Sequence, residues 1–578
     1  MAATARKRFV FVGGIPVFDY MVSVMMEEIT RAAGNNVIIV GSRILLPIGT
    51  LFKLTVPELD RVLYLNPMAN VEIQNLQDKL YYAMEFGGKH PEQQGFQLCA
   101  EKEVIFAELN ARYPNVVATV DDLKVVEVAA PVQIHLGGNN KNILEEIKTL
   151  YASPELGGLT DDILFEHRFF FDTANPKFRM VDELYSRLGV SMGAREQMHV
   201  DGLVPRVGYV LTIVADDWVP MDRIILSNKA NEQIIPLEQL SRSYFELEYL
   251  LRKDANFIET HLVINSMTNQ DEMRFLVRLI QTAHASGVTT YLCPTLTLLN
   301  CIEKLVDKKY YALEQERFYQ YRRDFVYSAV VPYIKYIVLN RDELTLLDNS
   351  VEKKGVDATA TFLAHQMNRG RRGESAEGGR VVVTGGSKGA RYTEILPPER
   401  ATRFWEKARL AEARSVRFAD RRIICGDDYL TTFSSTLGAG DVFTGIFIGL
   451  TAVGWDGGHA MRAATLGAQH FIQHRTKPAV ADIVAIDESH IRFGTETELV
   501  DVISHHVNDS GDPSRYGTIS NTVITVTTTQ IQHPFSELLQ LATLIARKRS
   551  GLPTEAPPAR KPAKPAGPGK GGGGRKPK

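Results

Sequence analysis

Residues 9–14 read Phe-Val-Phe-Val-Gly-Gly, a short apolar run that two glycines stop. A strand inside a parallel sheet has this pattern, because both of its faces are covered and its side chains do not alternate between apolar and polar. Similar runs recur along the chain, and several are followed by Gly, Asn or Pro and then by a helix-like pattern. They lie at Val37–Val40, Tyr209–Val214, Leu262–Ile264, Tyr336–Leu339 and Arg380–Thr384.

Between and after these runs, apolar residues recur with the 3.6-residue spacing of amphipathic helices. The predicted helices are Asn142–Tyr151, Asp271–Ala285, Arg341–Leu347, Val442–Val453 and Gly457–His474. Strands that alternate with helices favour a mostly parallel sheet that carries helices on both faces. We therefore predict an α/β fold with three layers, in the order helix, sheet, helix.

Two regions interrupt this alternation, at roughly residues 40–130 and 195–240. Each is too long for a simple connection, and each contains too many apolar residues to be disordered. We predict that they form a smaller, β-rich lid on a main domain that covers residues 1–480. Residues 481–550 form an extension of unassigned role.

The last 28 residues, 551–578, consist mainly of Pro, Gly, Ala, Lys and Arg, with seven cations and one acid. Such a composition cannot bury a core, so we predict that this tail is disordered. The whole chain has a net charge of −2, so the other 550 residues are near −8. The tail reads either as a solubility tail or as a contact for nucleic acid or acidic partners.

Composition excludes several classes of protein. The four cysteines are widely spaced and form no C-x-x-C pair, which argues against a disulfide framework and against a zinc site. The N-terminal apolar stretch is broken by glycine, proline and Asp19, and no run of 18 apolar residues occurs. We expect a cytoplasmic protein with no membrane partner, and the sequence leaves its oligomeric state open.

The strongest chemical signal is residues 435–445, Ser-Thr-Leu-Gly-Ala-Gly-Asp-Val-Phe-Thr-Gly. Free amide groups at a helix start attract anions, and glycines let the backbone approach a phosphate closely. Asp441 at that start could take the proton of an attacking hydroxyl, while the amides of Ala439, Gly440 and Asp441 hold growing negative charge. The same string alone also describes an ordinary helix start.

Three further segments combine glycine or asparagine with a strand end or a helix start. They are Gly137–Asn142 (Gly-Gly-Asn-Asn-Lys-Asn), Asn340–Glu343 (Asn-Arg-Asp-Glu) and Val381–Ala390 (Val-Val-Val-Thr-Gly-Gly-Ser-Lys-Gly-Ala). Each has a simpler interpretation. The first can be a turn with a helix cap, the second a capping pair of Asn340 with Glu343, and the third a turn that ends a strand.

In this order, the four segments resemble the motifs of the ribokinase-like (PfkB) carbohydrate kinases, over roughly residues 9–475. The resemblance implies that a phosphoryl group passes from a nucleotide to a sugar hydroxyl, with Mg²⁺ as cofactor and small-molecule partners. It implies catalytic roles for Gly438, Ala439, Gly440 and Asp441, substrate binding by Asp19, Gly137, Gly138, Asn139 and Asn142, nucleotide binding by Asn340, Thr384, Gly386, Gly389 and Thr436, and magnesium binding by Glu343. For Asp19, a cap before a helix at Tyr20–Met26 is the simpler alternative.

The length of the chain points to one branch of that superfamily. The 117 residues between Asp19 and Gly137 form a large insertion, and the ADP-dependent glucokinases and phosphofructokinases are similar in having one. The resemblance thus favours ADP as donor and glucose or fructose 6-phosphate as the class of acceptor. An ATP-dependent kinase for a sugar or nucleoside is the alternative.

The chain also departs from the pattern of this branch. Asn140 and Lys141 replace small residues, and the H-x-E motif expected near Thr290–Thr295 is not recognisable. A protein that binds a sugar or nucleotide without turnover therefore remains a further alternative.

Overall fold

The computed structural model describes most of the chain between residues 7 and 502, together with one short strand beyond it. The described ranges are 7–13, 17–34, 36–40, 43–56, 61–69, 72–76, 79–85, 95–99, 101–127, 133–156, 163–193, 198–214, 221–226, 235–254, 257–265, 272–295, 298–299, 326–348, 351–369, 379–386, 389–396, 415–425, 438–455, 457–485, 491–493, 497–502 and 524–527. Within these ranges, no helix combines the length and the apolar character needed to cross a membrane.

A large sheet forms the centre of the structure. Seven neighbouring strands run parallel, in the order β13 (Val190–Ser191), β12 (Ile163–Arg168), β1 (Lys7–Val12), β16 (Glu259–Ile264), β17 (Thr289–Leu292), β18 (Tyr336–Asn340) and β19 (Arg380–Thr384). The antiparallel strands β20 (Ala390–Leu396), β21 (Ser415–Cys425), β23 (Thr497–Val502) and β24 (Ile524–Thr527) follow, and β22 (Ile491–Phe493) also pairs with β21. The prediction of a mostly parallel α/β sheet is confirmed.

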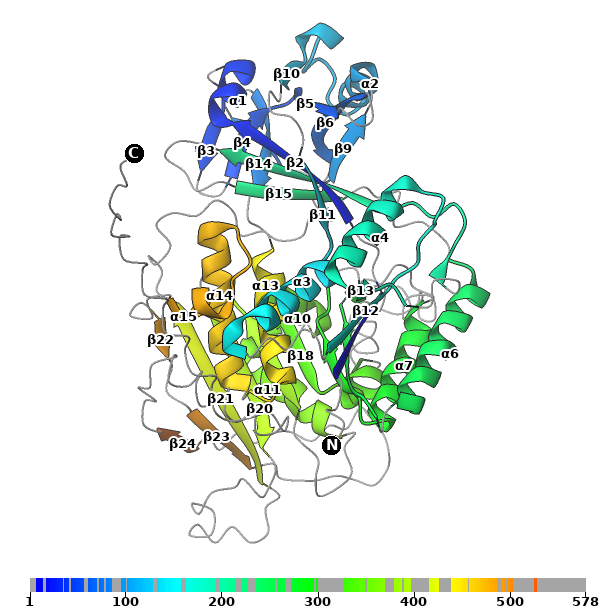
Figure 1. Ribbon diagram of the computed structural model, residues 1–578. Coiled ribbons are helices and arrows are strands. Elements are labelled where there is room, and N and C mark those ends of the chain that lie inside the picture. The colour runs from blue at the N-terminus through cyan, green and yellow to red at the C-terminus, as the bar shows by residue number, and fades with distance from the viewer. Residues whose placement is uncertain are drawn as a thin grey trace, which may run out of the picture.

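Helices cover this sheet, and most of them match the predicted ranges. They are α3 (Asn139–Ala152), α4 (Pro176–Leu188), α6 (Leu237–Asp254), α7 (Glu272–Ala285), α10 (Arg341–Leu347), α11 (Val351–Arg369), α13 (Ala439–Ala452), α14 (Gly457–His474) and α15 (Val480–Ala485). Figure 1 shows α3, α13 and α14 on one side of the large sheet, and α6 and α7 together on the opposite side of the molecule.

Helix α13 lies between α3 and α14 and packs its apolar surface onto the sheet. The Phe447 ring lies 5.9 Å from the ring of Tyr336 and 6.4 Å from that of Tyr392, measured between centroids. Nearly every residue of the helix is buried. This explains why the segment is apolar all round, since a helix covered on every side needs no polar face.

Three smaller sheets lie together at the top of the view in Figure 1. The first contains β11 (Gln133–Gly137), β2 (Val17–Met25), β14 (Arg206–Val214) and β15 (Met221–Leu226). The second contains β3 (Ile38–Val40), β4 (Arg43–Pro47), β8 (Lys79–Glu85) and β7 (Glu72–Leu76), and the third β10 (Lys124–Glu127), β5 (Thr50–Val56), β6 (Arg61–Ala69) and β9 (Gly95–Cys99). Helices α1 (Met26–Ala33) and α2 (Lys102–Arg112) belong to the same stretch of chain.

These sheets correct two details of the sequence interpretation. Val37–Val40 and Tyr209–Val214 are strands, but they lie in small sheets and not in the large parallel one. Residues 20–25 continue strand β2, so the alternative of a helix at Tyr20–Met26 is wrong. A short apolar run does not distinguish a buried parallel strand from a strand of a small sheet with its own core. The role of these sheets as a lid stays a prediction.

The stretch that contains the second and third small sheets has an apolar cluster of its own. Its buried members are Ile48, Leu51, Tyr82, Ile105, Leu109, Val117 and Leu123. Further along, β22, β23 and β24 show that parts of residues 481–550 extend the large sheet. The predicted tail 551–578 lies outside the described residues.

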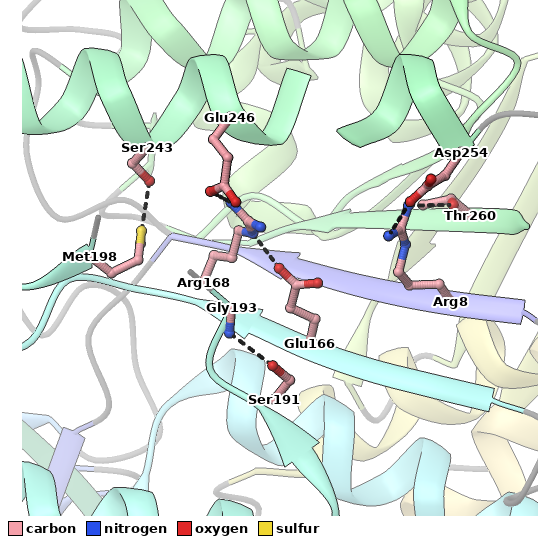
Figure 2. A network of polar contacts seen from close by, with 10 residues as sticks. All are labelled: Arg8, Glu166, Arg168, Ser191, Gly193, Met198, Ser243, Glu246, Asp254 and Thr260. Carbon is pink, nitrogen blue, oxygen red and sulfur yellow. Dashed lines mark hydrogen bonds and ion pairs between the residues drawn. The ribbon is translucent and has the colours of Figure 1, made fainter. Parts of the chain in front are cut away.

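Ion pairs fasten α6 to the strands at one end of the large sheet, as Figure 2 shows. The Arg168 guanidinium at the end of β12 contacts Glu166 on its own strand and Glu246 of α6, the latter at 2.9 Å. Arg8 of β1 reaches Asp254 of α6 at 2.9 Å. Arg168 is almost fully buried, so these contacts are shielded from water. Arg168 lies at the carboxyl end of β12, the edge of the sheet that borders the candidate site, whereas Arg8 lies near the amino end of β1.

The helix pair α3 and α13 approaches closely because two glycines face α3. A Cβ atom on Gly445 would lie 2.6 Å from Cβ of Glu146, and one on Gly449 would lie 2.9 Å from Cδ2 of Leu150. The Tyr151 hydroxyl donates to the Gly449 carbonyl at 2.7 Å. The contacts between the two helices therefore repeat every four residues, and this repeat determines which residues of their first turns meet.

Candidate active site

The candidate site lies where the parallel strands of the large sheet end and α3, α10 and α13 begin. Helix α13 starts at Gly438, which has a φ of 84° in the left-handed region, and the Val442 N–H donates to the Gly438 carbonyl at 3.0 Å. Glycine adopts this conformation without the strain that a side chain would add. Asp441 lies in the first turn, where the amide groups have no partner inside the helix.

Asn142 is the side chain that holds Asp441. Its Nδ2 donates a hydrogen bond of 2.8 Å to Oδ2 of Asp441. Asn142 lies in the first turn of α3. This helix begins directly after Gly138, whose φ of 104° allows the chain to turn from β11 into the helix. The resemblance assigned Asn142 to substrate binding. The structure brings its side chain to the predicted base, where it orients the carboxylate, and its contact with substrate stays a prediction.

The surroundings of Asp441 change its acidity. Burial raises the pKa of the Asp441 carboxyl to about 6, although the Asn142 hydrogen bond opposes this rise. The positive charges of Lys477 and Lys141 also oppose it. A carboxyl with a pKa near 6 is mostly ionised at neutral pH and still accepts a proton readily, which suits a general base.

Asn340 and Glu343 form a reciprocal cap at the start of α10. The Asn340 N–H donates to Oε2 of Glu343, and the Glu343 N–H donates to Oδ1 of Asn340, both at 2.8 Å. The capping interpretation of this pair is therefore correct. Burial raises the pKa of Glu343 to about 7, and the negative charge of Asp441 contributes to the rise. The cap and a second role for Glu343 are compatible, because the cap engages only Oε2.

Cys293 follows β17 inside the segment where the H-x-E motif was expected. Its N–H donates to the Ile264 carbonyl at 2.8 Å, and its thiol is buried. Burial raises the pKa of Cys293 above its usual range, and the charges of Glu343 and Asp441 add to this effect. The position therefore carries a neutral thiol near the two acids, and not a third carboxylate.

Glu343 suits a magnesium ion. The negative charge of Asp441 raises the pKa of the Glu343 carboxyl, and one oxygen of Glu343 is outside the cap. A hard divalent cation with oxygen ligands relieves such repulsion, and Mg²⁺ usually combines one or two carboxylates with phosphate and water. Glu343 thus fits the predicted cofactor.

The predicted nucleotide residues lie on the neighbouring strand end. Asn340 pairs with Thr384 across β18 and β19, and the chain then turns through Gly386 and Gly389. The Gly389 N–H donates to the Gly386 carbonyl at 3.0 Å, and both glycines have a positive φ. These residues follow Asn340 along the same sheet edge. Thr436 lies outside the described residues.

Two of the predicted substrate segments are joined through the first small sheet. Gly137 of β11 pairs with Val17 of β2, and Asp19 lies two residues further along β2, opposite His135. The next residue after Gly137 is the cap of α3. The strand of Asp19 therefore pairs with the strand that leads directly into the helix of Asn142. Gly138 is partly exposed and Asn139 is exposed.

Sequence reasoning missed a buried polar group beside this turn. Asn140 donates from Nδ2 to the Gly13 carbonyl at 2.8 Å, and His167 contacts the same carbonyl from Nε2 at 3.3 Å. The Tyr185 hydroxyl lies 2.7 Å from Nδ1 of His167. Burial lowers the pKa of His167 to about 4, so the ring is neutral. Asn140 was noted only as a departure from the family, yet it ties α3 to the end of β1.

Comparisons with known proteins add little to this geometry. No family model matches the chain, and no curated protein matches it. The solved structures similar to it include a mutant phosphofructokinase-2 from Escherichia coli, with 12% identity, 82% of this chain and 97% of that chain covered, and a TM-score of 0.39. Another is an adenosine kinase from Sinorhizobium meliloti, with 12% identity, 81% and 94% coverage, and a TM-score of 0.38.

A third similar structure is an adenosine kinase from Schistosoma mansoni in complex with 2-fluoroadenosine. It shares 12% identity, covers 81% of this chain and 96% of its own, and has a TM-score of 0.41. These solved structures are sugar and nucleoside kinases by name. At such low identity and TM-score, the likeness carries no argument about the reaction of this chain, which is therefore argued from its own residues.

Proposed function

We propose that this protein is a phosphotransferase that moves a phosphoryl group from a nucleotide to an alcohol group of a sugar or nucleoside, with Asp441 as general base. One observation supports this proposal above the others. A carboxylate with a pKa of about 6 lies in the first turn of a buried helix, at the carboxyl edge of a parallel sheet, and an amide from a second helix start holds it. Open α/β sheets bind ligands at this edge.

The proposed chemistry uses each part of this arrangement. Asp441 accepts the proton of the acceptor hydroxyl, so that the oxygen can attack the phosphorus atom, and the donor leaves as the nucleotide with one phosphate fewer. Asn142 keeps the carboxylate oriented during this step. The amide groups at the start of α13 stabilise the charge on the transferred group, and the exposed Gly440 leaves room for a phosphate there.

Glu343 is the described residue that would hold Mg²⁺. The ion would supply positive charge against the phosphates of the donor. Asn340 orients Glu343 through the cap, and Thr384 with the turn at Gly386 and Gly389 borders the same edge, where the nucleotide would bind. Asp19 and the Gly137–Asn139 turn are proposed to contact the acceptor.

The donor is proposed as a nucleotide without a choice between ADP and ATP. The insertion after Asp19 favoured ADP, but neither the contacts of the described residues nor the names of the similar structures support that preference. Initial rates with ADP and with ATP, each against glucose, fructose 6-phosphate, ribose and adenosine, separate the two donors. Strict use of ATP would remove the ADP-dependent hypothesis.

The base assignment is tested by Asp441→Asn. The substitution keeps the shape of the side chain but removes the proton acceptor, so we expect kcat to fall by about two to four orders of magnitude while the donor still binds. Calorimetric titration of the nucleotide measures the binding. Asp121→Asn, which removes an exposed carboxylate outside the site, is the control and should keep full activity. An Asp441→Asn enzyme with normal kcat contradicts the proposal.

A second candidate function rests on Cys293. The segment Thr290–Thr295, where the resembling family has an acid, contains no acid in this chain, and it holds the buried, uncharged thiol of Cys293. A protein that binds a sugar or nucleotide without turnover fits this observation. Nucleotide binding by calorimetry without product formation on any acceptor of the panel would favour it over the phosphotransferase.

A further inference from the structure

A lysine from outside all four motifs reaches the first turn of α3. Lys477 lies in the turn between α14 and α15, and its Nζ donates to the Asn142 carbonyl at 2.9 Å. The same Nζ contacts Oε2 of Glu145 at 2.7 Å. The side chain of Asn142 binds Asp441, so Lys477 binds the backbone of the residue that orients the proposed base.

The contact is built into the fold and is shielded from water. The Glu145 carboxylate also pairs with Lys141 at 3.0 Å, and the side chains of Lys477, Glu145 and Lys141 are only 22%, 16% and 14% exposed. Ion pairs with so little exposure are weakened less by water and salt than pairs on the surface. The turn is also tied to the far end of α3, because the Val480 N–H donates to Oγ of Ser153 at 3.1 Å.

Charged and titratable groups lie near Asp441 on the described elements that pack against the start of α13. Lys477 and Lys141 act on it as cations, and Glu343 and the neutral Cys293 face it from α10 and from the end of β17. Further groups are Glu145 and Glu146 on α3, and Arg475, which stacks on the Phe471 ring beside Gly438. Among these, Lys477 is the cation that also touches Asn142.

We propose that Lys477 is a positioning residue for Asp441: it fixes the first turn of α3, so that the Asn142 amide stays on the carboxylate. The positive charge of Lys477 also favours the ionised form of the base. This inference rests on the proposed phosphotransferase function. It assigns a role in the reaction to a segment after α14 that none of the four motifs includes.

Three variants of Lys477 separate position from charge. Lys477→Met removes both contacts, and we expect kcat to fall about tenfold while the KM values for donor and acceptor change less than twofold, because the substrates are not touched. The acidic limb of the pH profile of kcat should move to higher pH, since loss of a nearby cation makes Asp441 harder to ionise. Lys477→Arg keeps the charge and should restore most of both properties.

Lys477→Gln keeps a donor for the Asn142 carbonyl but carries no charge. It should recover part of kcat and still show the shifted acidic limb. Lys148→Met is the matched control, because Lys148 lies on α3 beyond its first turn, with its Nζ over the Phe165 ring, 4.8 Å from the centroid. It should leave kcat and the pH profile unchanged. Thermal melting of each variant sets an assay temperature at which all are folded.

A titration that needs no activity distinguishes failure of this inference from failure of the proposed function. Difference infrared spectroscopy against Asp441→Asn isolates the Asp441 carboxyl band, and its pKa should rise in Lys477→Met. A rise in this pKa, in a protein that shows no turnover, supports the positioning role but refutes the phosphotransferase function. If the protein shows turnover but Lys477→Met changes neither the pKa of the Asp441 carboxyl band nor the acidic limb of the pH profile, the positioning role is wrong, whether or not kcat falls.

Discussion

Asp441 and Glu343 lie far apart in the chain, yet the charge of Asp441 raises the pKa of Glu343. Burial is the largest cause for both acids, and it brings their pKa values to about 6 and about 7. The motifs of these two acids predict roles for them, and these roles stay predictions. Their acidity could not be predicted, because it depends on neighbours such as Lys477 that only the folded chain brings close.

The raised pKa of Glu343 predicts a pH-dependent affinity for magnesium. A proton and the cation compete for this carboxyl, so the apparent affinity for Mg²⁺ should increase as pH rises through about 7. Initial rates against Mg²⁺ concentration at several pH values measure it. Glu343→Gln should weaken the affinity and flatten its pH dependence. Asp121→Asn, which removes an exposed carboxylate outside the site, should keep that dependence.

Glu146 is a residue that the proposed reaction does not use. Its side chain is fully buried, and neither carboxylate oxygen has a hydrogen-bond partner in the described part of the chain. Burial raises the pKa of Glu146 to about 8, although the charge of Lys477 opposes this. When the pKa of an acid is higher in the folded than in the unfolded chain, the free energy of unfolding decreases as pH rises. The reason is that the unfolded chain releases the proton first.

Glu146→Gln should therefore stabilise the protein at high pH. The free energy of unfolding of the variant relative to the parent chain should grow as pH rises from about 4.5 to about 8 and then level off. We expect a gain on the order of 2 kcal/mol at pH 8. Denaturant unfolding at pH 5 and pH 8 measures the difference. An equal effect at both values would mean that the pKa of Glu146 is the same in the folded and in the unfolded chain.

Helices α3 and α13 determine the site through their packing. Asn142 meets Asp441, Glu146 meets Gly445 and Leu150 meets Gly449, so the pairs repeat every four residues along both helices. The sequence predicted both helices and the glycine-rich starts. It did not predict that Asn142 would contact Asp441, because the contact depends on the register of two helices almost 300 residues apart in the chain.

Gly445→Ala tests this register. The new Cβ would lie 2.6 Å from Cβ of Glu146 and 3.0 Å from the Ile143 carbonyl oxygen, so the helices must separate. We expect a loss of stability of about 1–3 kcal/mol and a lower kcat, because Asn142 moves away from Asp441. Gly449→Ala is the comparison, since its new Cβ would meet the flexible end of Leu150. Denaturant unfolding and initial rates should show the smaller effect there.

At the scale of the whole molecule, the alternation of strands and helices was enough to predict the parallel sheet. The order of its strands was not, because pairing across the sheet depends on contacts between distant segments. Arg206–Val214 is an example, since it pairs with β2 of a small sheet and not with a strand of the large one. Local patterns indicate an element, and tertiary contacts decide which sheet receives it.

The basic tail gives a test at the same scale. Removal of residues 551–578 should leave kcat, KM and the melting temperature unchanged, because a Pro- and Gly-rich segment buries no core. Initial rates and thermal melting of the shortened chain check this. A drop in either would assign the tail a role in the folded enzyme. Salt-dependent binding to DNA that disappears with the tail would instead support a nucleic-acid contact.

The pairing of β2 with β11 gives the long insertion a simple origin. These strands are antiparallel neighbours, with Met21 opposite Gln133, so the chain leaves the first small sheet after β2 and returns to the adjacent strand. A tight hairpin turn could make the same connection. Residues 26–132 thus form a module inserted between two strands that a hairpin could join, and part of this module has an apolar cluster of its own. Evolution could lengthen or replace such a module without rearranging the strands that carry the chemistry.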